Sequence, residues 1–171
     1  KILIDPRQTG TVFVAVQGKL WGDNEERGVY KTTDFGATWE RILYVDARTG
    51  AADLTMDPRN PDVLYAAMWE HRRDPDFFVS GGLGSALYKS IDGGKTWKKL
   101  EGNGLPPQPY GRIAIEVAPS APDTVYATIE TKDKEDKGMY RSFDAGLTWK
   151  KVSNELNTYV RPFYFSWITI D

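Results

Sequence analysis

Cysteine is absent from the 171-residue sequence, and histidine occurs once, as His71. The lack of cysteine excludes disulfides, thiolate catalysis and zinc sites built on cysteine. A single histidine argues against a histidine-rich metal site and against a serine–histidine catalytic triad. We therefore expect no bound metal and no other cofactor.

The sequence also lacks an excess of charge and any long apolar run. Its 22 basic and 24 acidic residues give a net charge of −2, whereas nucleic-acid binding usually requires a strong basic excess. No apolar run approaches the roughly 18 residues that a membrane-spanning helix needs. We expect neither a nucleic-acid partner nor membrane insertion. The 13% aromatic residues, 16 Gly and 10 Pro indicate a folded domain with many turns.

Three octapeptides share the pattern Ser/Thr-x-Asp-x-Gly-x-Thr-Trp, at residues 32–39, 90–97 and 142–149. Five matched positions in three copies define an internal repeat. The aspartates are separated by 58 (92 − 34) and 52 (144 − 92) residues. The shared positions are occupied by Thr32, Asp34, Gly36, Thr38, Trp39, Ser90, Asp92, Gly94, Thr96, Trp97, Ser142, Asp144, Gly146, Thr148 and Trp149.

The flanks of the octapeptides predict four strands per repeat. A short apolar run with a tyrosine precedes each octapeptide, and polar–apolar alternation follows each tryptophan. Further upstream, residues 2–16, 54–68 and 115–129 each predict a strand, a proline-centred turn and a second strand. Four antiparallel strands in about 50–60 residues are typical of a β-propeller blade. The sequence therefore predicts an all-β fold, a partial β-propeller of about three four-stranded antiparallel blades.

We expect residues 1–171 to form a single partial propeller, with repeats at about 1–53, 54–113 and 114–166 and with residues 167–171 starting the next blade. Propellers normally close with about four to eight blades. Three blades alone would leave apolar blade faces uncovered. The expected partners are therefore the remaining blades of a longer parent chain or a second copy of this chain.

The octapeptide resembles the Asp box, also called the bacterial neuraminidase repeat, of sialidases, xyloglucanase-type glycoside hydrolases, sortilin-type receptors and a plant photosystem assembly factor. The resemblance implies a propeller fold, with boxes at the blade periphery between the third and fourth strands. The residue chemistry suits a turn fastener, because Asp accepts backbone N–H bonds, Gly permits positive φ and Trp buries a large apolar face. The alternative, three catalytic or calcium-binding aspartates, is disfavoured because an active site needs convergent residues with different roles.

Function is expected on the rim opposite the boxes, in the loops between second and third strands and in the connections between blades. Aromatic rings, carboxylates and arginines suit carbohydrate or peptide recognition there. Alternatively, Trp21 and Trp69 pack between blades and His71 is a surface residue. The candidate ligand-binding residues are Trp21, Asp23, Glu25, Trp69, Glu70, His71, Tyr110, Arg112, Arg161 and Tyr164.

Two functions follow. The first is a segment of a larger protein that acts as a recognition or scaffold module for a glycan, a peptide or a protein. The alternative is part of a sialidase-like or xyloglucanase-like glycoside hydrolase whose active site is completed by other blades, since no spacing in this sequence selects a catalytic carboxylate pair. The resembling families are mostly secreted, lumenal or surface proteins, which implies an extracytoplasmic location.

Overall fold

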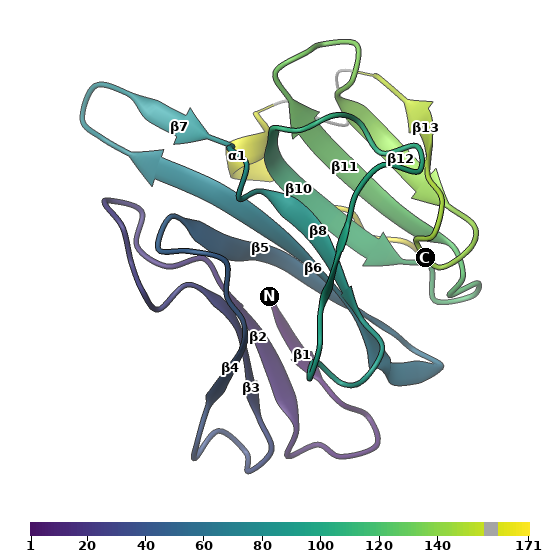
Figure 1. Ribbon diagram of the computed structural model, residues 1–171. Coiled ribbons are helices and arrows are strands. Elements are labelled where there is room, and N and C mark those ends of the chain that lie inside the picture. The colour runs from purple at the N-terminus through teal and green to yellow at the C-terminus, as the bar shows by residue number, and fades with distance from the viewer. Residues whose placement is uncertain (156–160) are drawn as a thin grey trace.

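The computed structural model describes residues 1–155 and 161–171, and these form three antiparallel sheets in chain order (Figure 1). The first sheet comprises β1 (Ile2–Ile4), β2 (Val12–Val16), β3 (Gly28–Thr32) and β4 (Glu40–Leu43). The second comprises β5 (Thr49–Asp57), β6 (Asn60–Arg73), β8 (Ala86–Ser90) and β9 (Lys98–Leu100), with β7 (Phe78–Ser80) paired to the far end of β6. The third comprises β10 (Tyr110–Val117), β11 (Val125–Thr131), β12 (Gly138–Ser142) and β13 (Lys150–Ser153).

Each sheet is a meander in which successive strands pair, apart from the short strand β7. The octapeptides connect β3 to β4, β8 to β9 and β12 to β13, which are the third and fourth strands of each blade. The prediction of about three four-stranded blades with the octapeptide in this hairpin is therefore confirmed.

The chain after the third blade is only partly described. Residues 156–160, in the third predicted connection between blades, lie outside the described residues. A single helical turn, α1 (Pro162–Phe165), contacts β10. Residues 166–171 join none of the three sheets, and the assignment of residues 167–171 to another blade stays a prediction.

One element differs from the sequence-based expectation. The repeat pattern predicts a loop between the second and third strands of the second blade, at residues 70–85, but β6 continues to Arg73. Its last residues pair with β7, so that His71 faces Ser80 and Arg73 faces Phe78 across the hairpin. The added partner strand satisfies backbone groups that a loop would leave to solvent. The hairpin projects from the second sheet at the upper left of Figure 1.

The hydrophobic core lies between neighbouring sheets rather than within one sheet. Strand β6 is buried on both faces, and its side chains alternate between two clusters. Leu64, Ala66 and Met68 pack with Phe13 and Val29 of the first sheet. Tyr65 and Ala67 join a second cluster that is built mainly by the third sheet. A blade is therefore stabilised mainly by packing against its neighbours. Each large aliphatic side chain that is fully buried there contributes about 1.5–3 kcal/mol to the free energy of folding.

Hydrogen bonds between blades repeat with the sequence. Lys31, directly before the first octapeptide, donates from Nζ to the carbonyl oxygen of Gly93 in the second octapeptide at 2.9 Å. Lys89 holds the same place before the second octapeptide, and its Nζ donates to the carbonyl oxygen of Ala145 in the third at 2.7 Å. The hydroxyl of Tyr65 donates to the same Ala145 oxygen at 2.8 Å. The second and third boxes thus also accept a bond from the preceding blade.

Replacing Lys89 by methionine tests this contact between blades. Methionine keeps an apolar stem of similar length but removes the ammonium donor, while the Tyr65 hydroxyl still serves the carbonyl. We expect the free energy of unfolding to fall by about 1 kcal/mol. Urea denaturation of the 171-residue chain measures the change. Lys98→Met, at an exposed position of β9, is the control and should stay within about 0.5 kcal/mol of the parent. Equal effects of both variants would contradict the assigned role.

Candidate functional site

The aspartate of each octapeptide is bound by the same set of donors in all three copies. The first hydroxyl of the box donates to Oδ1 at 2.7–2.8 Å. The threonine before the tryptophan donates its N–H to Oδ1 at 2.8–2.9 Å and its hydroxyl to Oδ2 at 2.6 Å. The glycines have φ between 85° and 91° and donate their N–H groups to the first hydroxyl at 2.8–3.0 Å. The side-chain bonds that close each turn therefore all come from within its own octapeptide.

These bonds fix the charge of the box carboxylates. Hydrogen bonds, led by the threonine hydroxyl, lower the pKa of Asp34, Asp92 and Asp144 to about 2, so all three are ionised at neutral pH. Each carboxylate bonds within its own turn, and each turn belongs to a different blade. Among residues 1–155 and 161–171, no group of three or more His, Asp or Glu side chains is placed to hold a metal ion. The boxes have the geometry of turn fasteners.

The box tryptophans differ in burial although their local contacts are identical. Each indole Nε1–H donates to the carbonyl oxygen of the box glycine at 3.1 Å. Trp149 is 6% exposed because it packs in the cluster shared by the second and third sheets. Trp97 is half-buried against the cluster shared by the first and second sheets. Trp39 is 46% exposed, since the described residues include no blade before the first.

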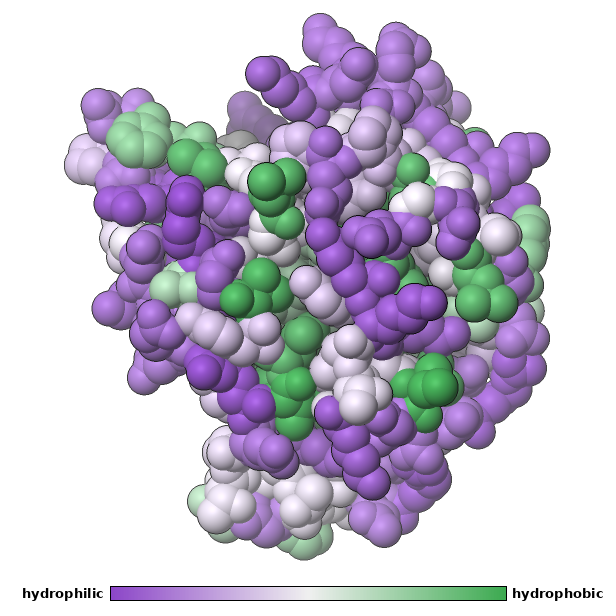
Figure 2. Space-filling view, viewed as in Figure 1, coloured by the Kyte–Doolittle hydropathy of each residue, from purple (hydrophilic) through white to green (hydrophobic). Residues whose placement is uncertain are grey.

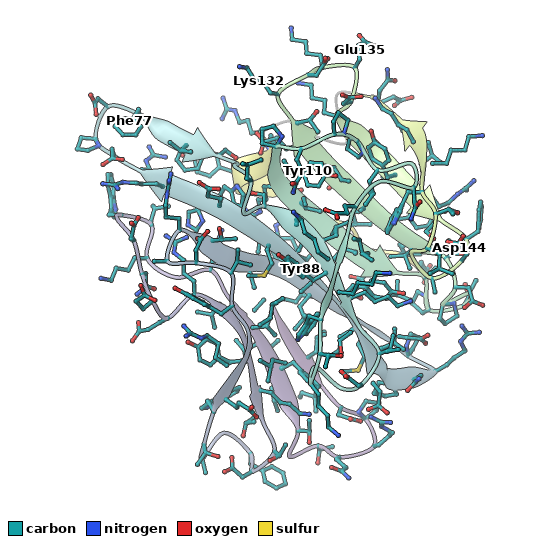
Figure 3. All side chains as sticks on the ribbon, in the orientation of Figure 1. Phe77, Tyr88, Tyr110, Lys132, Glu135 and Asp144 are labelled. Atoms are coloured by element: carbon teal, nitrogen blue, oxygen red, sulfur yellow. The ribbon has the colours of Figure 1, made fainter. Side chains whose placement is uncertain are left out.

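The rim opposite the boxes is separated from them by the length of the strands. In the third blade, Lys132 and Glu135 lie at the end of the sheet that joins β11 to β12, while Asp144 lies at the other end (Figure 3). Across the face seen in Figure 2, hydrophobic residues form separate patches among hydrophilic ones. The site therefore has to be identified from local geometry rather than from one dominant apolar surface.

A pocket of about 360 Å³ lies on this opposite rim. There the second and third blades meet α1 and the loop that joins β2 to β3. The polar lining of the pocket comes from Gln17, from β6 and β10 and from the C-terminal segment, and its apolar lining includes Leu20 and Phe78. The residues that line it are Gln17, Gly18, Leu20, Trp69, His71, Arg73, Phe78, Arg112 and Tyr164. Trp69, His71 and Arg73 come from alternate positions of β6, which place them on one face of the strand.

A stack of cationic and aromatic groups supports one wall of the pocket. The rings of Trp69 and His71 are parallel within 16° and 4.3 Å apart, and the Arg112 guanidinium lies 5.3 Å from the Trp69 ring. Arg27, which is completely buried, approaches His71 Nδ1 with Nη1 at 3.0 Å. A guanidinium only donates, so the neutral imidazole is the acceptor of this bond. Trp69 is 2% exposed and serves as a support, because both of its faces are covered.

Histidine 71 is neutral in this environment. Burial is the largest cause that lowers its pKa to about 4, and the positive charges of Arg27 and Arg112 act in the same direction. The expectation of a surface histidine is wrong, since His71 is only 2% exposed. The continuation of β6 beyond Trp69 is the physical reason, because it carries the imidazole beneath the loop of residues 17–27.

The structure brings together four of the ten predicted ligand-binding residues, namely Trp69, His71, Arg112 and Tyr164. The other six do not line this pocket. Among them, Tyr110 is a core residue whose hydroxyl donates to the carbonyl oxygen of Pro106 at 2.7 Å. Trp21 and Arg161 are exposed.

The three remaining predicted residues are rim carboxylates, and each has a polar partner. Asp23 lies 3.8 Å from Arg72, which also pairs with Asp74 at 3.1 Å. Glu25 Oε2 accepts from the Tyr44 hydroxyl at 2.5 Å. Glu70 pairs with Arg48 at 3.3 Å and accepts the N–H of Gly84 at 3.1 Å. These contacts give the three carboxylates roles in holding the loops.

Sequence reasoning missed Arg73, Phe78, Leu20 and the buried Arg27. The sequence does contain a signal for Arg73, because residues 69, 71 and 73 are alternate positions that share one face of a strand. The pairing that places Phe78 opposite Arg73 could be inferred only once residues 78–80 were known to form a strand. Arg27 carries no local signal, since its partners are the His71 ring and the carbonyl oxygens of Lys19, Gly22 and Arg48.

A second cavity, of about 340 Å³, is lined by Val14, Val16, Glu26, Tyr30 and Trp39 on the first blade. Trp149, the counterpart of Trp39, is covered by the preceding blade. The cavity therefore lies on the face of the first blade that corresponds to the covered face of the third.

The fold and the repeated turns define an Asp-box repeat protein of the β-propeller class, and the BNR/Asp-box repeat family matches residues 88–99. The chain is 26% identical over 184 residues to a xyloglucanase of Acetivibrio thermocellus, across 90% of this chain and 20% of that protein. It is 23% identical over 185 residues to a xyloglucanase of Hypocrea jecorina, across 92% of this chain and 20% of the relative. The chain thus spans about a fifth of the length of these relatives.

Solved structures show the same fold. The GH74 enzyme of Niastella koreensis superposes with a TM-score of 0.63 at 23% identity, over 87% of this chain and 21% of that one. The GH74 xyloglucanase of Xanthomonas campestris gives a TM-score of 0.64 at 18% identity, over 89% and 21%. No helix in the described part of the chain has the length and apolarity that crossing a membrane requires.

Proposed function

We propose that the chain is the glycan-recognition part of a glycoside-hydrolase-type Asp-box propeller, and that the pocket on the rim opposite the boxes is its binding site. The observation that carries the proposal is the pocket itself, which combines aromatic and apolar side chains with two arginines. Such a lining suits a sugar, because rings bind the apolar faces of pyranoses while polar groups fix their orientation. The similarity to xyloglucanases supports the same class of ligand.

Within this proposal the chain binds but does not by itself catalyse hydrolysis. Glycoside hydrolysis by two carboxyl groups needs them about 5–5.5 Å apart for retention or 6.5–9.5 Å apart for inversion, facing the scissile bond. None of the described residues that line the pocket is a carboxylate. The nearby Asp23, Asp74 and Glu70 are paired with arginines. Catalytic carboxylates would therefore come from other blades of a parent chain, and an extracytoplasmic location would give access to plant polysaccharides.

Titration calorimetry of the 171-residue chain with xyloglucan oligosaccharides tests the proposal. Tyr164 is 49% exposed at the pocket, so Tyr164→Ala is expected to weaken binding about tenfold, which equals about 1.4 kcal/mol. Phe143→Ala is the matched control, because Phe143 is a 65% exposed aromatic residue on the box rim of the third blade. This variant should bind like the parent. Absence of binding by neutral and acidic oligosaccharides alike would overturn the proposal.

A further inference from the structure

We propose that the pocket selects a sugar ring that carries a carboxylate, and that Arg73 and Arg112 bind this carboxylate. The inference rests on the proposed function and narrows its ligand to acidic, uronate-containing glycans. A planar guanidinium can bind a carboxylate through two parallel N–H···O bonds.

The two arginines approach the pocket from adjacent blades. Arg73 comes from the end of β6, and its Nη1 donates to the Tyr164 hydroxyl at 2.8 Å. Its guanidinium also lies 5.9 Å from the Phe78 ring. Arg112 comes from β10 and is held over the Trp69 ring at 5.3 Å. Aromatic and hydroxyl contacts therefore hold both guanidinium groups at the pocket, which lowers the entropy lost when a ligand binds them.

The electrostatics of the lining favour an anion. Arg73 and Arg112 are the charged groups among the described lining residues, because His71 is neutral. Arg112 interacts electrostatically with the carboxylates of Asp53 and Glu130, and neither of these residues lines the pocket.

Those two carboxylates also accept hydrogen bonds from other donors. Asp53 accepts the N–H groups of Ile115 at 3.0 Å and of Leu54 at 2.9 Å. Glu130 accepts the Ser80 hydroxyl at 2.7 Å and the Arg112 backbone N–H at 2.8 Å. A half-buried site with two positive charges and no lining carboxylate attracts an anion more strongly than a neutral sugar.

The apolar lining defines the rest of the ligand. Tyr164 and Phe78 offer aromatic surface beside the arginines, and Leu20, 45% exposed, adds an aliphatic edge. A simple anion such as phosphate would leave this surface unused, whereas a uronate has a carboxylate on one edge of a ring with apolar C–H faces. At about 360 Å³ the pocket lies at the small end of ligand sites, which suits one or two sugar units.

A comparison of one oligosaccharide with its ester tests the inference. Calorimetry would compare trigalacturonate, its fully methyl-esterified form and a neutral xyloglucan oligosaccharide, all with the 171-residue chain. The ester keeps every ring contact but removes the charge. We expect the acid to bind at least about tenfold more tightly than the ester at low salt, and this preference to shrink as salt is raised.

Two variants test whether the preference for the acid over the ester arises in the pocket. Arg73→Gln, in a half-buried hairpin position, is expected to reduce the preference for acid over ester about tenfold, and Arg112→Gln should act in the same direction. Arg59→Gln, which removes an exposed arginine from the box rim, should leave the preference unchanged. Thermal unfolding of each variant shows that the fold is kept, and either pocket variant suffices if the other fails to fold.

The outcomes separate the inference from the proposed function. Equal binding of acid and ester, or tighter binding of the neutral oligosaccharide, would overturn the inference while supporting a glycan site. A preference for the acid that survives both Arg73→Gln and Arg112→Gln would also overturn it. If none of the three sugars binds, both proposals fall.

Discussion

Replacement of Trp149 by alanine is expected to lower the free energy of unfolding by about 3–5 kcal/mol, which is the usual cost of truncating a large buried aromatic side chain. Trp149 is 6% exposed and packs between the second and third sheets. The variant loses this contact and also the indole bond to the carbonyl oxygen of Gly146. Chemical denaturation of the 171-residue chain measures the change.

The sequence offers its own control for this experiment. Trp39 has the same place in its octapeptide and the same indole hydrogen bond, but it is 46% exposed. Trp39→Ala is therefore expected to cost about 1 kcal/mol, since it loses mostly local contacts. If the two substitutions had equal effects, the stabilisation would arise inside the octapeptide, and the role assigned to the neighbouring blade would be wrong.

This contrast explains why the fold was easier to predict than the site. The octapeptide is closed by bonds within eight residues and is repeated three times, so its pattern could be read locally. Alternation around it then predicted four strands per blade. The burial of Trp149 depends instead on packing against residues of the second sheet, and the sequence pattern of a single box carries no information on them.

The residues around the pocket are even harder to predict, because they come from distant parts of the sequence. His71 acquires its surroundings from Arg27, 44 residues earlier, and from Arg112, which follows 41 residues later (112 − 71). Tyr164 reaches the hydroxyl contact with Arg73 across 91 residues. The prediction that ligands bind on the rim opposite the boxes included four of the residues that line the pocket. The choice among neighbours such as Glu70 and His71 required the register of β6, because adjacent residues of a strand face opposite sides.

The pH dependence of stability is the second large effect that we expect. His71 has its pKa lowered from 6.5 to about 4 by burial and by the charges of Arg27 and Arg112. The unfolded chain therefore binds a proton between pH 6.5 and 4, while the folded chain does not. Stability is complete above pH 6.5 and falls as the pH decreases toward 4, by about 3 kcal/mol across the window. Because His71 is the only histidine, no other imidazole contributes to this slope.

The carboxylates with shifted pKa values change the stability outside this pH window or with the opposite sign. The box aspartates, with pKa values lowered to about 2, stabilise the fold above pH 4 and lose this contribution only as the pH falls below it. Burial raises the pKa of Asp53, which favours the folded state as the pH falls and partly offsets the effect of His71. Urea denaturation at pH 7.0, 5.5 and 4.5 should therefore show a steady loss in the parent chain. His71→Gln should remove most of this slope even if its stability at pH 7.0 is lower, and an unchanged slope would place the titrating group elsewhere.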